Sequence, residues 1–567
     1  MNKIFEQLLQ VRGIGRGFLR PKYEDLAPAE ELPDMKKAID KLIEARNQQR
    51  KVLIYGDYDV DGVTATAILK ETLTMIGFLD VSTMLPDRFV DGYGMSKRLV
   101  QKAKEEKIGL VITVDCGSNN PEIITELVLA GMEVIVTDHH ELNGEAPKDA
   151  VAVVNPKRME FRKKVLERQA QIIEMGEEDD DGGRNDKHGA TPVDIAGLLE
   201  LSGAGVAFMV AKALANRGEI KNGQEKWLLD LAMIGTICDA MKLTCDNRII
   251  CKFGMIVLEK TRRPGLKELI RVAETKRIDA EAIGFQIGPR LNAAGRLKSA
   301  KMALDLLTTD SKTEAAKLAQ QLDELNTERR KQQTEAVTEV EAQGERDEPV
   351  MVVQGKWHEG IVGIISGRLT EKYKKPSFVL TEVDGVLKGS GRSFGEFNLA
   401  LALSECQDLL IGGGGHAAAC GLKLKPENFE EFRRKINSYY MGLGLENQER
   451  FLSAREDLAV TEVGELNLDL MDEMKEMEPF GEGNPEPVFL LPEVFVLDVS
   501  RMGVEGQHLR MLVRGEDGKT LKLVAFNAEN EWLELKPGGR VNAFIALTEN
   551  EWNGIRSVEG RILKLVY

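Results

Sequence analysis

A chain of 567 residues is long enough for about four domains of ~150 residues each, and its composition is that of an ordinary globular protein. The formal net charge of −16 excludes a uniformly basic nucleic-acid coat, although a local basic channel or bound cations can still hold a polyanion. No apolar run approaches the ~20 residues that span a bilayer, no secretory signal is recognisable, and the six cysteines form no CxxC pair, so we expect a cytoplasmic protein with reduced thiols and no membrane segment.

Between residues 52 and about 155, short apolar segments alternate with helical stretches. Strands are expected at 52–55, 81–85, 110–114, 134–137 and 151–154. Strands that alternate with helices predict an α/β fold with a parallel sheet and right-handed crossovers.

The first four of these strands each run into side chains that can do chemistry. Open α/β sheets bind ligands beyond the carboxyl ends of their strands, so we expect these side chains to meet at one edge. For Asp87 we prefer a simpler interpretation, in which it caps the helix that follows its strand. The other side chains at this edge are Asp57, Asp59, Asp61, Arg88, Asp115, Asp138, His139 and His140.

The alternating aspartates of residues 57–61 also invite comparison with a calcium-binding EF-hand. Gly62 occupies the sixth position of such a loop, but the twelfth position holds Ile68 where an EF-hand has glutamate. A strand, rather than a helix, is expected before the loop. The EF-hand interpretation is therefore excluded.

The chain changes character after residue 155. Residues 156–195 lack apolar periodicity and predict a mobile surface loop, in which His188 is interpreted as a solvated residue. Residues 196–308 are expected to be mainly helical, and an apolar stretch there ends in Asp239. An aspartate at the end of a buried helix needs partners, and a metal ion is one candidate.

Three further segments complete the predicted organisation. Residues 311–348 read as a long polar helix that connects two domains, and a second α/β domain follows over 349–450. It includes a glycine-rich turn at Gly413–Gly415. Five short strands within 451–567 fit an OB-like β-barrel, a fold that often binds single-stranded nucleic acid, although a barrel without special function fits the pattern almost equally well. Residues 1–310 would then form the first domain.

Aspartates mixed with a few histidines are typical ligands of Mn²⁺ or Mg²⁺, whereas structural zinc prefers cysteine. A pair of such ions about 3.5–4 Å apart can activate water and stabilise both oxygens of a phosphoryl displacement. We therefore expect hydrolysis of a phosphodiester or phosphoanhydride with two divalent ions, Mn²⁺ preferred over Mg²⁺. The predicted catalytic and metal-binding residues are Asp57, Asp59, Asp61, Asp115, His139, His140 and Asp239.

Several motifs, taken in order, resemble those of a known family. YGDYDVDG (residues 55–62), VDCG (114–117) and TDHH (137–140) are similar to motifs of the DHH phosphoesterases. PDRFVDGYG (86–94), IGPRLNAAGR (287–296) and KGSGRS (388–393) narrow the resemblance to the RecJ exonucleases. GGGH (413–416) resembles the signature of the DHHA1 domain, and EPFGEGNP (478–485) resembles the segment that leads into the RecJ OB domain.

The resemblance implies an exonuclease that degrades single-stranded DNA from the 5′ end to mononucleotides, in recombination and repair. His140 would be a metal ligand or would face the scissile phosphate. A helicase and a single-stranded-DNA-binding protein are the expected partners of a monomeric enzyme. The resemblance implies a substrate site made of Arg88, Arg290, Ser390, Arg392, Gly413, Gly414, Gly415 and His416.

Two other functions stay open from the sequence. A DHH phosphodiesterase of short oligoribonucleotides or cyclic dinucleotides would use the same cluster, but such enzymes usually lack a C-terminal barrel. A catalytically inactive nucleic-acid clamp would have lost metal ligands, and here all the expected acids and His139 are present.

Overall fold

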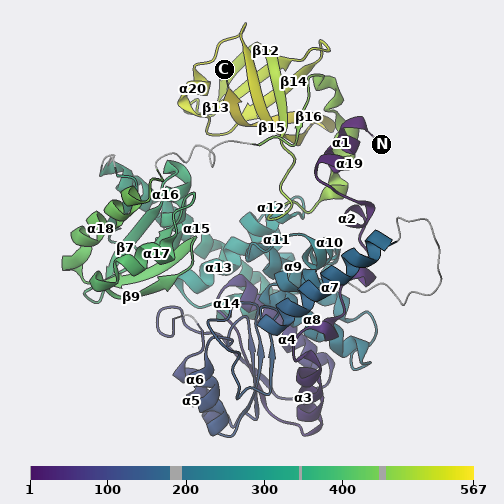
Figure 1. Cartoon of the computed structure of the whole chain (residues 1–567), viewed down its shortest axis with the longest axis vertical. Helices are drawn as coiled ribbons and strands as arrows, with labels where there is room; N and C mark the ends of the chain where they lie inside the picture. Colours follow the sequence, from purple (N-terminus) through teal and green to yellow (C-terminus); the bar gives the residue numbers. More distant parts are fainter. Residues whose placement is uncertain (1, 93, 179–193, 344–347, 446–454, 567) are drawn as a thin grey trace.

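The structure is a computed structural model that describes residues 2–92, 94–178, 194–343, 348–445 and 455–566. A parallel sheet with its helices lies at the bottom of Figure 1, helices and a second sheet lie above it, and a β-barrel lies at the top. This arrangement confirms the predicted fold class. Within the described ranges, no helix is long and apolar enough to cross a membrane.

The first sheet is parallel throughout, with strand order β2-β1-β3-β4-β5. Each strand begins and ends within one residue of its predicted bounds. The strands are β1 (Val52–Tyr55), β2 (Val81–Met84), β3 (Leu110–Val114), β4 (Glu133–Thr137) and β5 (Ala152–Val154).

Helices cover both faces of this sheet. Val52 and Ile54 of β1 belong to the core that contains α3 (Met35–Asn47) and α4 (Val60–Met75). The alternate residues Leu53 and Tyr55 belong to a second core, together with α5 (Lys97–Glu105) and α6 (Pro121–Leu129). A strand buried on both faces reads as an unbroken apolar run, which is why β1 could be recognised from its sequence.

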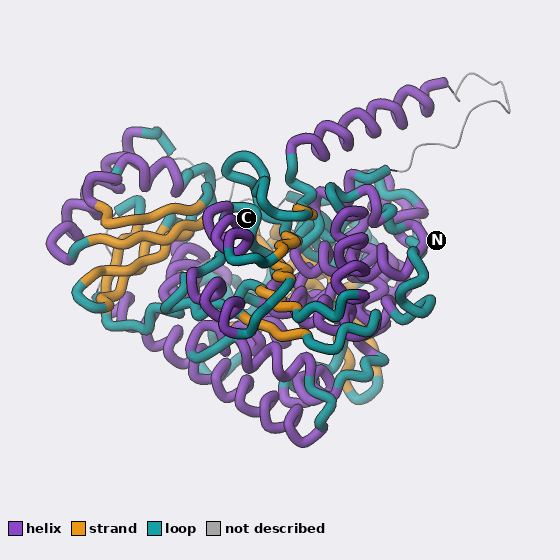
Figure 2. Tube along the Cα trace, turned by 90° about the horizontal axis from the view of Figure 1, so that it is seen from below, coloured by secondary structure: helices purple, strands orange, loops and turns teal. Residues whose placement is uncertain are grey.

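The prediction of a surface loop over residues 156–195 is wrong for its first half. Residues Met159–Glu178 form helix α7, which extends outward from the rest of the molecule in Figure 2. Phe161 and Val165, one helical turn apart, are buried in the main core and attach the start of this helix to the body. Residues 179–193, with His188, lie outside the described ranges.

A helical layer follows, as predicted. Its helices α8 and α9 pack on α4, and α8 also contacts β3 and β4 of the first sheet. Its helices are α8 (Gly203–Asn216), α9 (Leu229–Cys238), α10 (Cys245–Glu259), α11 (Pro264–Val272), α12 (Ala280–Ala282), α13 (Gly288–Leu297) and α14 (Lys301–Thr308). The predicted connecting helix is α15 (Lys312–Ala342), which contacts α13 at one end and α16 (Val362–Tyr373) at the other.

The second sheet is mixed, with strand order β6-β7-β8-β10-β9. Only β6 and β7 run parallel; the other pairs are antiparallel. The prediction of a glycine-rich turn at Gly413–Gly415 is wrong, because these residues form part of edge strand β9, paired with β10. The remaining elements are β6 (Met351–Gly355), β7 (Ser377–Val383), β8 (Val386–Arg392), β9 (Leu410–Gly415), β10 (Ala419–Leu424), α17 (Leu399–Glu405) and α18 (Phe429–Gly442).

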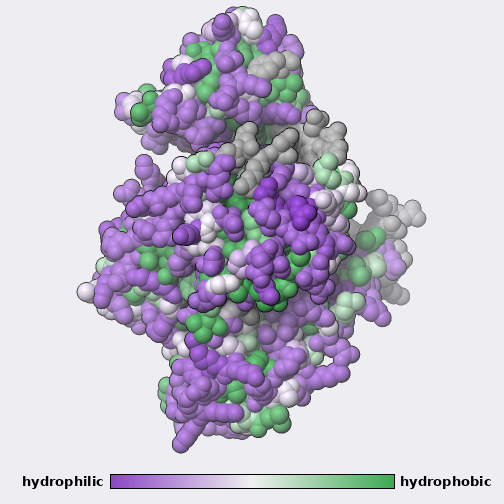
Figure 3. Space-filling view, turned by 90° about the vertical axis from the view of Figure 1, so that its left-hand side faces the viewer, coloured by the Kyte–Doolittle hydropathy of each residue, from purple (hydrophilic) through white to green (hydrophobic). Residues whose placement is uncertain are grey.

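The C-terminal strands close into a barrel because β12 pairs with both β13 and β15. All five predicted strands are present. The elements are β11 (Leu458–Ala459), α19 (Leu468–Met474), β12 (Phe489–Met502), β13 (His508–Arg514), β14 (Thr520–Ala525), α20 (Asn530–Leu533), β15 (Arg540–Trp552) and β16 (Ile555–Val566). Seen from the left of Figure 1, the molecular surface is mostly hydrophilic, with hydrophobic residues in smaller groups (Figure 3).

The packing of the N-terminus differs from the predicted first domain of residues 1–310. Helix α1 (Lys3–Val11) places Ile4, Phe5 and Leu8 in the hydrophobic core of the C-terminal barrel, and α2 (Arg16–Leu19) adds Leu19. Apolar side chains at helical spacing do not reveal which core they join. The boundaries at 310, 348 and 450 remain a proposal.

Candidate metal centre and phosphate site

Three aspartates reach the edge of the first sheet at the junction of β1 and α4. Asp59 precedes the helix, and its Oδ1 accepts a hydrogen bond from the Gly62 N–H at 3.0 Å. A Cβ at position 62 would lie 2.6 Å from backbone atoms of Asp57, so glycine is required for this close approach. One tight turn thus presents the carboxylates of Asp57, Asp59 and Asp61.

Asp61 is held by the first turn of α8. Its two carboxylate oxygens accept hydrogen bonds from the N–H groups of Gly203 at 2.6 Å and Ala204 at 2.9 Å. The N-terminus of a helix favours negative charge, and its free N–H groups need acceptors. Asp61 therefore joins the helical layer to the sheet edge.

Asp115 follows β3 in a left-handed backbone conformation, with φ of 58°. Few residues other than glycine adopt this conformation, and it is common at functional sites. The backbone N–H of Asp115 still donates to the Thr137 carbonyl at 3.0 Å, so the turn is tied to β4. The carboxylate is buried and points to where the acids of other elements converge.

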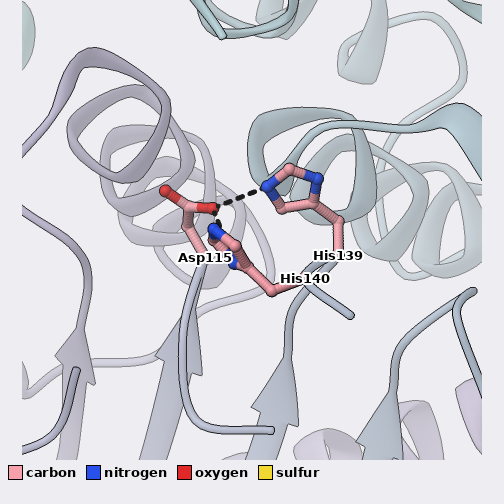
Figure 4. Close-up of side chains that lie close together, drawn as sticks. All are labelled: Asp115, His139 and His140. Atoms are coloured by element: carbon pink, nitrogen blue, oxygen red, sulfur yellow. Dashed lines mark ion pairs between the residues drawn. The ribbon is translucent and has the colours of Figure 1, made fainter. Parts of the chain in front are cut away.

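His139 joins the carboxylates of three separate elements. Its Nε2 lies 3.1 Å from Asp115 Oδ1, 3.5 Å from Asp239 Oδ2 and 3.7 Å from Asp61 Oδ2. Figure 4 shows the rings of His139 and His140 on the same side of Asp115. Asp239, the last residue of this set, directly follows α9, at the end of the apolar stretch.

His140 is oriented by Asp138, a residue that the sequence analysis placed at the edge but not among the catalytic residues. His140 Nδ1 lies 2.8 Å from Asp138 Oδ1 and 3.8 Å from Asp115 Oδ1. Burial opposes the charge of the ring, but the hydrogen bond and charge of Asp138 outweigh it and raise the pKa of His140 to about 9. The sequence could have indicated this role of Asp138, because Asp138 directly precedes the two histidines. Histidines that bind metals commonly donate their other ring N–H to a carboxylate.

Burial and mutual repulsion oppose the ionisation of the clustered acids. Burial and the charge of Asp59 raise the pKa of Asp57 to about 8, and burial with the charges of Asp61 and Asp59 raises the pKa of Asp239 to about 8. Burial, chiefly, lowers the pKa of His139 to about 3. Such a cluster requires a countercharge, and neutral imidazole is the form that binds metals.

The residues present fit divalent cations. Three sets of three residues can each offer donor atoms that lie within 4.8 Å of one another, and the sets overlap at Asp115 and His139. Buried Oδ1 atoms of Asp57 and Asp115 and Nε2 of His139 have no hydrogen-bond partner among the described residues, so their ligand capacity is unused. The three sets are Asp57, Asp59 and Asp115; Asp61, His139 and Asp239; and Asp115, His139 and His140.

Predicted substrate residues from both α/β domains lie between these domains. The Arg88 guanidinium lies 4.9 Å from the centre of the Tyr58 ring, beside the metal cluster. Phe89, the next residue, packs edge-on against His358 of the second domain at 5.4 Å. In that domain, Arg392 Nη1 donates to Ser390 Oγ at 3.0 Å. Asp87 accepts from the Phe89 N–H at 2.9 Å and so caps a turn. The prediction that it caps the helix after its strand is wrong, because that helix, α5, begins only at Lys97.

Gly414, the middle one of the predicted glycines, shares a register with Ser390. Gly414 pairs with Gly421, which pairs with Ser390, so the three residues lie in one row across β9, β10 and β8. A Cβ at Gly414 would meet nothing within 4 Å, which leaves an open surface beside Ser390. His416 follows β9 and is exposed, and its N–H donates to the Ala419 carbonyl at 2.9 Å. The roles of these glycines and of His416 remain a prediction.

Arg290 differs from the other predicted phosphate ligands because its charge is already paired. Its Nε donates to Asp323 Oδ1 at 2.8 Å and its Nη1 to the Gln286 carbonyl at 2.8 Å. This pairing fixes α13 against α15 and favours a structural role. Arg296, from the same motif, lies near Arg88 and Arg392 and has no ion pair with any described carboxylate. The role of Arg290 as a phosphate ligand remains a prediction.

Comparisons with known proteins agree with this arrangement. The family models that match are the DHH family, N-terminal domain, over residues 51–236, the DHHA1 domain over 347–442 and the RecJ OB domain over 459–564.

Two curated relatives match over nearly the whole chain. The single-stranded-DNA-specific exonuclease RecJ of Bacillus subtilis is 36% identical over 549 residues, which cover 95% of this chain. The chain spans 64% of the length of that relative. The RecJ of Dickeya dadantii is 32% identical over 554 residues, which cover 92% of this chain and 88% of the relative.

A solved structure matches the whole chain. The crystal structure of RecJ in complex with Mn²⁺ from Thermus thermophilus superimposes with a TM-score of 0.80 at 29% identity. The match covers 100% of this chain and 76% of that protein. With three domain matches in order and relatives covered over most of their length, the chain belongs to the RecJ family.

Proposed function

We propose that this protein is a metal-dependent exonuclease that hydrolyses single-stranded DNA from its 5′ end to mononucleotides, in recombination and repair. The observation that carries the proposal is the overlap of three donor sets at Asp115 and His139, which suits a pair of divalent ions. RecJ of Bacillus subtilis and of Dickeya dadantii are named as single-stranded-DNA-specific exonucleases, and the Thermus thermophilus RecJ binds Mn²⁺ and, in a second structure, Mg²⁺.

Each residue of the cluster then has a stated task. Asp57, Asp59 and Asp115 would hold one ion, Asp61, His139 and Asp239 the other, and Asp115 lies where the two sets meet. Mn²⁺ or Mg²⁺, when bound, supplies an activated water and neutralises charge on the scissile phosphate. Asp138 fixes the ring of His140 through its Nδ1. The other ring nitrogen, Nε2, would then act as a metal ligand or as a hydrogen-bond donor to the scissile phosphate.

Residues of both α/β domains position the substrate end. Arg88 and Arg392 grip phosphate oxygens with their forked guanidinium groups, and Ser390 adds a hydroxyl donor. The C-terminal barrel extends the binding surface along the strand. This extension favours a long polymer over a dinucleotide, and the complete ligand set disfavours an inactive relative. A helicase would supply the unpaired strand, a single-stranded-DNA-binding protein would cover it, and the enzyme would act as a cytoplasmic monomer.

A nuclease assay tests this function. With Mn²⁺, the protein should shorten 5′-phosphorylated single strands and leave blunt duplex largely intact, and chelation should stop the reaction. Equal degradation of strands with blocked and free 5′ ends would refute the polarity. Asp115→Ala should abolish cleavage while DNA binding stays measurable.

A further inference from the structure

Four arginines from four elements gather between the two α/β domains: Arg88 after β2, Arg296 in α13, Arg329 in α15 and Arg392 in β8. Burial, followed by the charges of Arg88, Arg329 and Arg392, lowers the pKa of Arg296 to about 9. Across the described ranges, no carboxylate lies within 4.0 Å of any of these four guanidinium groups. In a protein with a net charge of −16, such a group of unpaired cations indicates a site for an anion.

Arg329 is the member of this group that no sequence motif indicated. Neutral amides hold its guanidinium: Nη2 donates to Asn326 Oδ1 at 3.0 Å and Nη1 to Gln333 Oε1 at 3.3 Å. Asn326, one turn earlier in α15, is only 3% exposed, so this support is rigid. The amides orient the guanidinium without neutralising its charge.

Arg290 of α13, which also packs against α15, differs from Arg329 in having a counterion. Its guanidinium meets a carboxylate of α15, Asp323, at 2.8 Å, whereas Arg329, six positions after Asp323, meets none in the part of the chain that the structure describes. A half-buried cation without a counterion loses hydration and gains no ion pair in return. The free energy of the site therefore improves when an anion binds.

A short series of contacts connects Arg329 with the predicted substrate residues of the second domain. Gln333, which holds Arg329, lies 3.5 Å through its Nε2 from the carbonyl of Ile364 in α16. The preceding residue, Gly363, packs so closely on β8 that a Cβ there would lie 3.2 Å from Ser390 Oγ and 3.3 Å from Arg392 Nη2. Arg329 of the connecting helix is thus linked, through Gln333 and the start of α16, to Ser390 and Arg392 of the second domain.

We propose that Arg329 is a phosphate-binding residue, and that the connecting helix α15 contributes directly to the nucleic-acid site as well as spacing the domains. The inference rests on the proposed function for the identity of the polyanion. Its ligand is a phosphate oxygen of the single strand, either the terminal 5′-phosphate or an internal phosphodiester. Asn326 is the positioning residue that keeps the guanidinium fork aimed between the domains.

The test compares Arg329→Gln with Arg330→Gln, a matched control that removes the same charge from the next, exposed position of α15. Arg329→Gln should raise KM for a 5′-phosphorylated single strand roughly ten-fold or more, with kcat changed far less, because one charged hydrogen-bonded contact is lost. The slope of log affinity against log salt should fall by about 0.7, the value for one phosphate of a single strand. Arg330→Gln should change KM less than about two-fold.

A comparison of 5′-phosphorylated and 5′-hydroxyl strands identifies which phosphate Arg329 binds. A defect that vanishes on a 5′-hydroxyl strand assigns Arg329 to the terminal phosphate, and an equal defect on both strands assigns it to an internal one. Arg329→Lys should recover part of the affinity, since it keeps charge and loses the fork. Equal KM and salt slope in the two glutamine variants would overturn the proposal.

Equilibrium binding of a fluorescent 5′-phosphorylated oligothymidine in chelator, with thermal melting as a folding control, measures the same contact without catalysis. If the wild-type protein binds this strand and, with Mn²⁺ restored, does not cleave it, the proposed function fails and the Arg329 comparison still stands. Indistinguishable affinities of wild type and Arg329→Gln in this assay would overturn the role of Arg329 alone.

Discussion

A Cβ atom on Gly203 would lie 2.6 Å from the Cβ of Asp115, closer than real Cβ contacts allow. Gly203 also begins α8 and donates its N–H to Asp61, so one glycine lets a helix approach two predicted metal ligands. The helical layer and the sheet edge are therefore packed together at the cluster itself. Any side chain at position 203 must push Asp115 or the start of α8 away.

Gly203→Ala is expected to lower activity at saturating Mn²⁺ by more than ten-fold, because a shift of about 1 Å at a catalytic group can cost ~100-fold in rate. The matched control is Gly367→Ala in α16, where a Cβ would meet nothing within 4 Å and alanine favours the helix. Steady-state kinetics and thermal melting of both variants check this. Wild-type activity in Gly203→Ala would show that the packing at Asp115 does not matter for catalysis.

Asp115→Asn should separate stability from function. The substitution removes one of several buried, mutually repelling carboxylates, so in chelator the melting temperature should equal or exceed that of wild type. Mn²⁺ should raise the melting temperature of wild type by mass action and leave that of the variant nearly unchanged. Differential scanning calorimetry with and without Mn²⁺ measures both effects. An equal Mn²⁺-induced shift in the two proteins would remove Asp115 from the metal site.

Arg248 of α10 should govern how the barrel is held on the catalytic body. This side chain is 2% exposed and donates to the carbonyls of Phe18 at 2.7 Å, Met477 at 2.8 Å and Glu476 at 3.0 Å. Arg248→Met removes three hydrogen bonds, although Asn484 still donates to the Met477 carbonyl and Lys252 to the Glu476 carbonyl. We expect a cost of about 3 kcal/mol in the free energy of unfolding.

Chemical denaturation measures that cost, and cleavage of long against short strands should show the larger loss on long ones. The control is Arg20→Met, which removes an exposed ion pair to Glu476 and should change little. If Arg248→Met and Arg20→Met behave alike, the three hydrogen bonds do not fix the barrel.

The stability of the protein should depend on pH through Asp246. Burial, chiefly, raises the pKa of this carboxyl to about 6 from 3.8. A group whose pKa is raised by folding favours the folded state when protonated, so its contribution is lost as the pH rises from about 4 through 6. The loss at pH 8 is about 3 kcal/mol, from 1.36 kcal/mol for each pKa unit.

Asp246→Asn keeps an acceptor for the Ala27 N–H, which Asp246 Oδ1 receives at 2.8 Å, and removes the charge. The variant should therefore match wild type near pH 4 and exceed it at pH 8. Urea denaturation at pH 4, 6 and 8 gives the comparison. A difference between the two proteins that does not change with pH would contradict the assignment.

Much of the fold and most of the metal cluster could be predicted because their signals are local. A buried strand such as β1 is an unbroken apolar run, and strand ends in a parallel sheet meet at one edge, which brought Asp57, Asp115 and His139 together. Asp239 was predicted from an apolar helix that ends in an acid. Its distance of 3.5 Å from His139 agrees with that prediction.

Other features depend on contacts between distant segments, and single-sequence patterns do not contain them. The hydrogen bonds of Asp61 join residues 142 and 143 positions apart, and the pairing that neutralises Arg290 comes from another helix. The apolar face of α1 gave no sign that it joins the barrel core at the other end of the chain. Helix α7 was missed because, up to residue 174, where the burial of its side chains is described, the buried apolar residues lie in its first turns.

A titration of the chelator-treated protein with Mn²⁺, read by calorimetry or by electron paramagnetic resonance, tests the central claim most directly. Wild type should bind two Mn²⁺ ions per chain at the cluster, and His139→Ala combined with Asp115→Ala should bind neither tightly. Two tightly bound ions in that double variant, or a wild-type protein that binds none, would contradict the proposed two-metal hydrolysis.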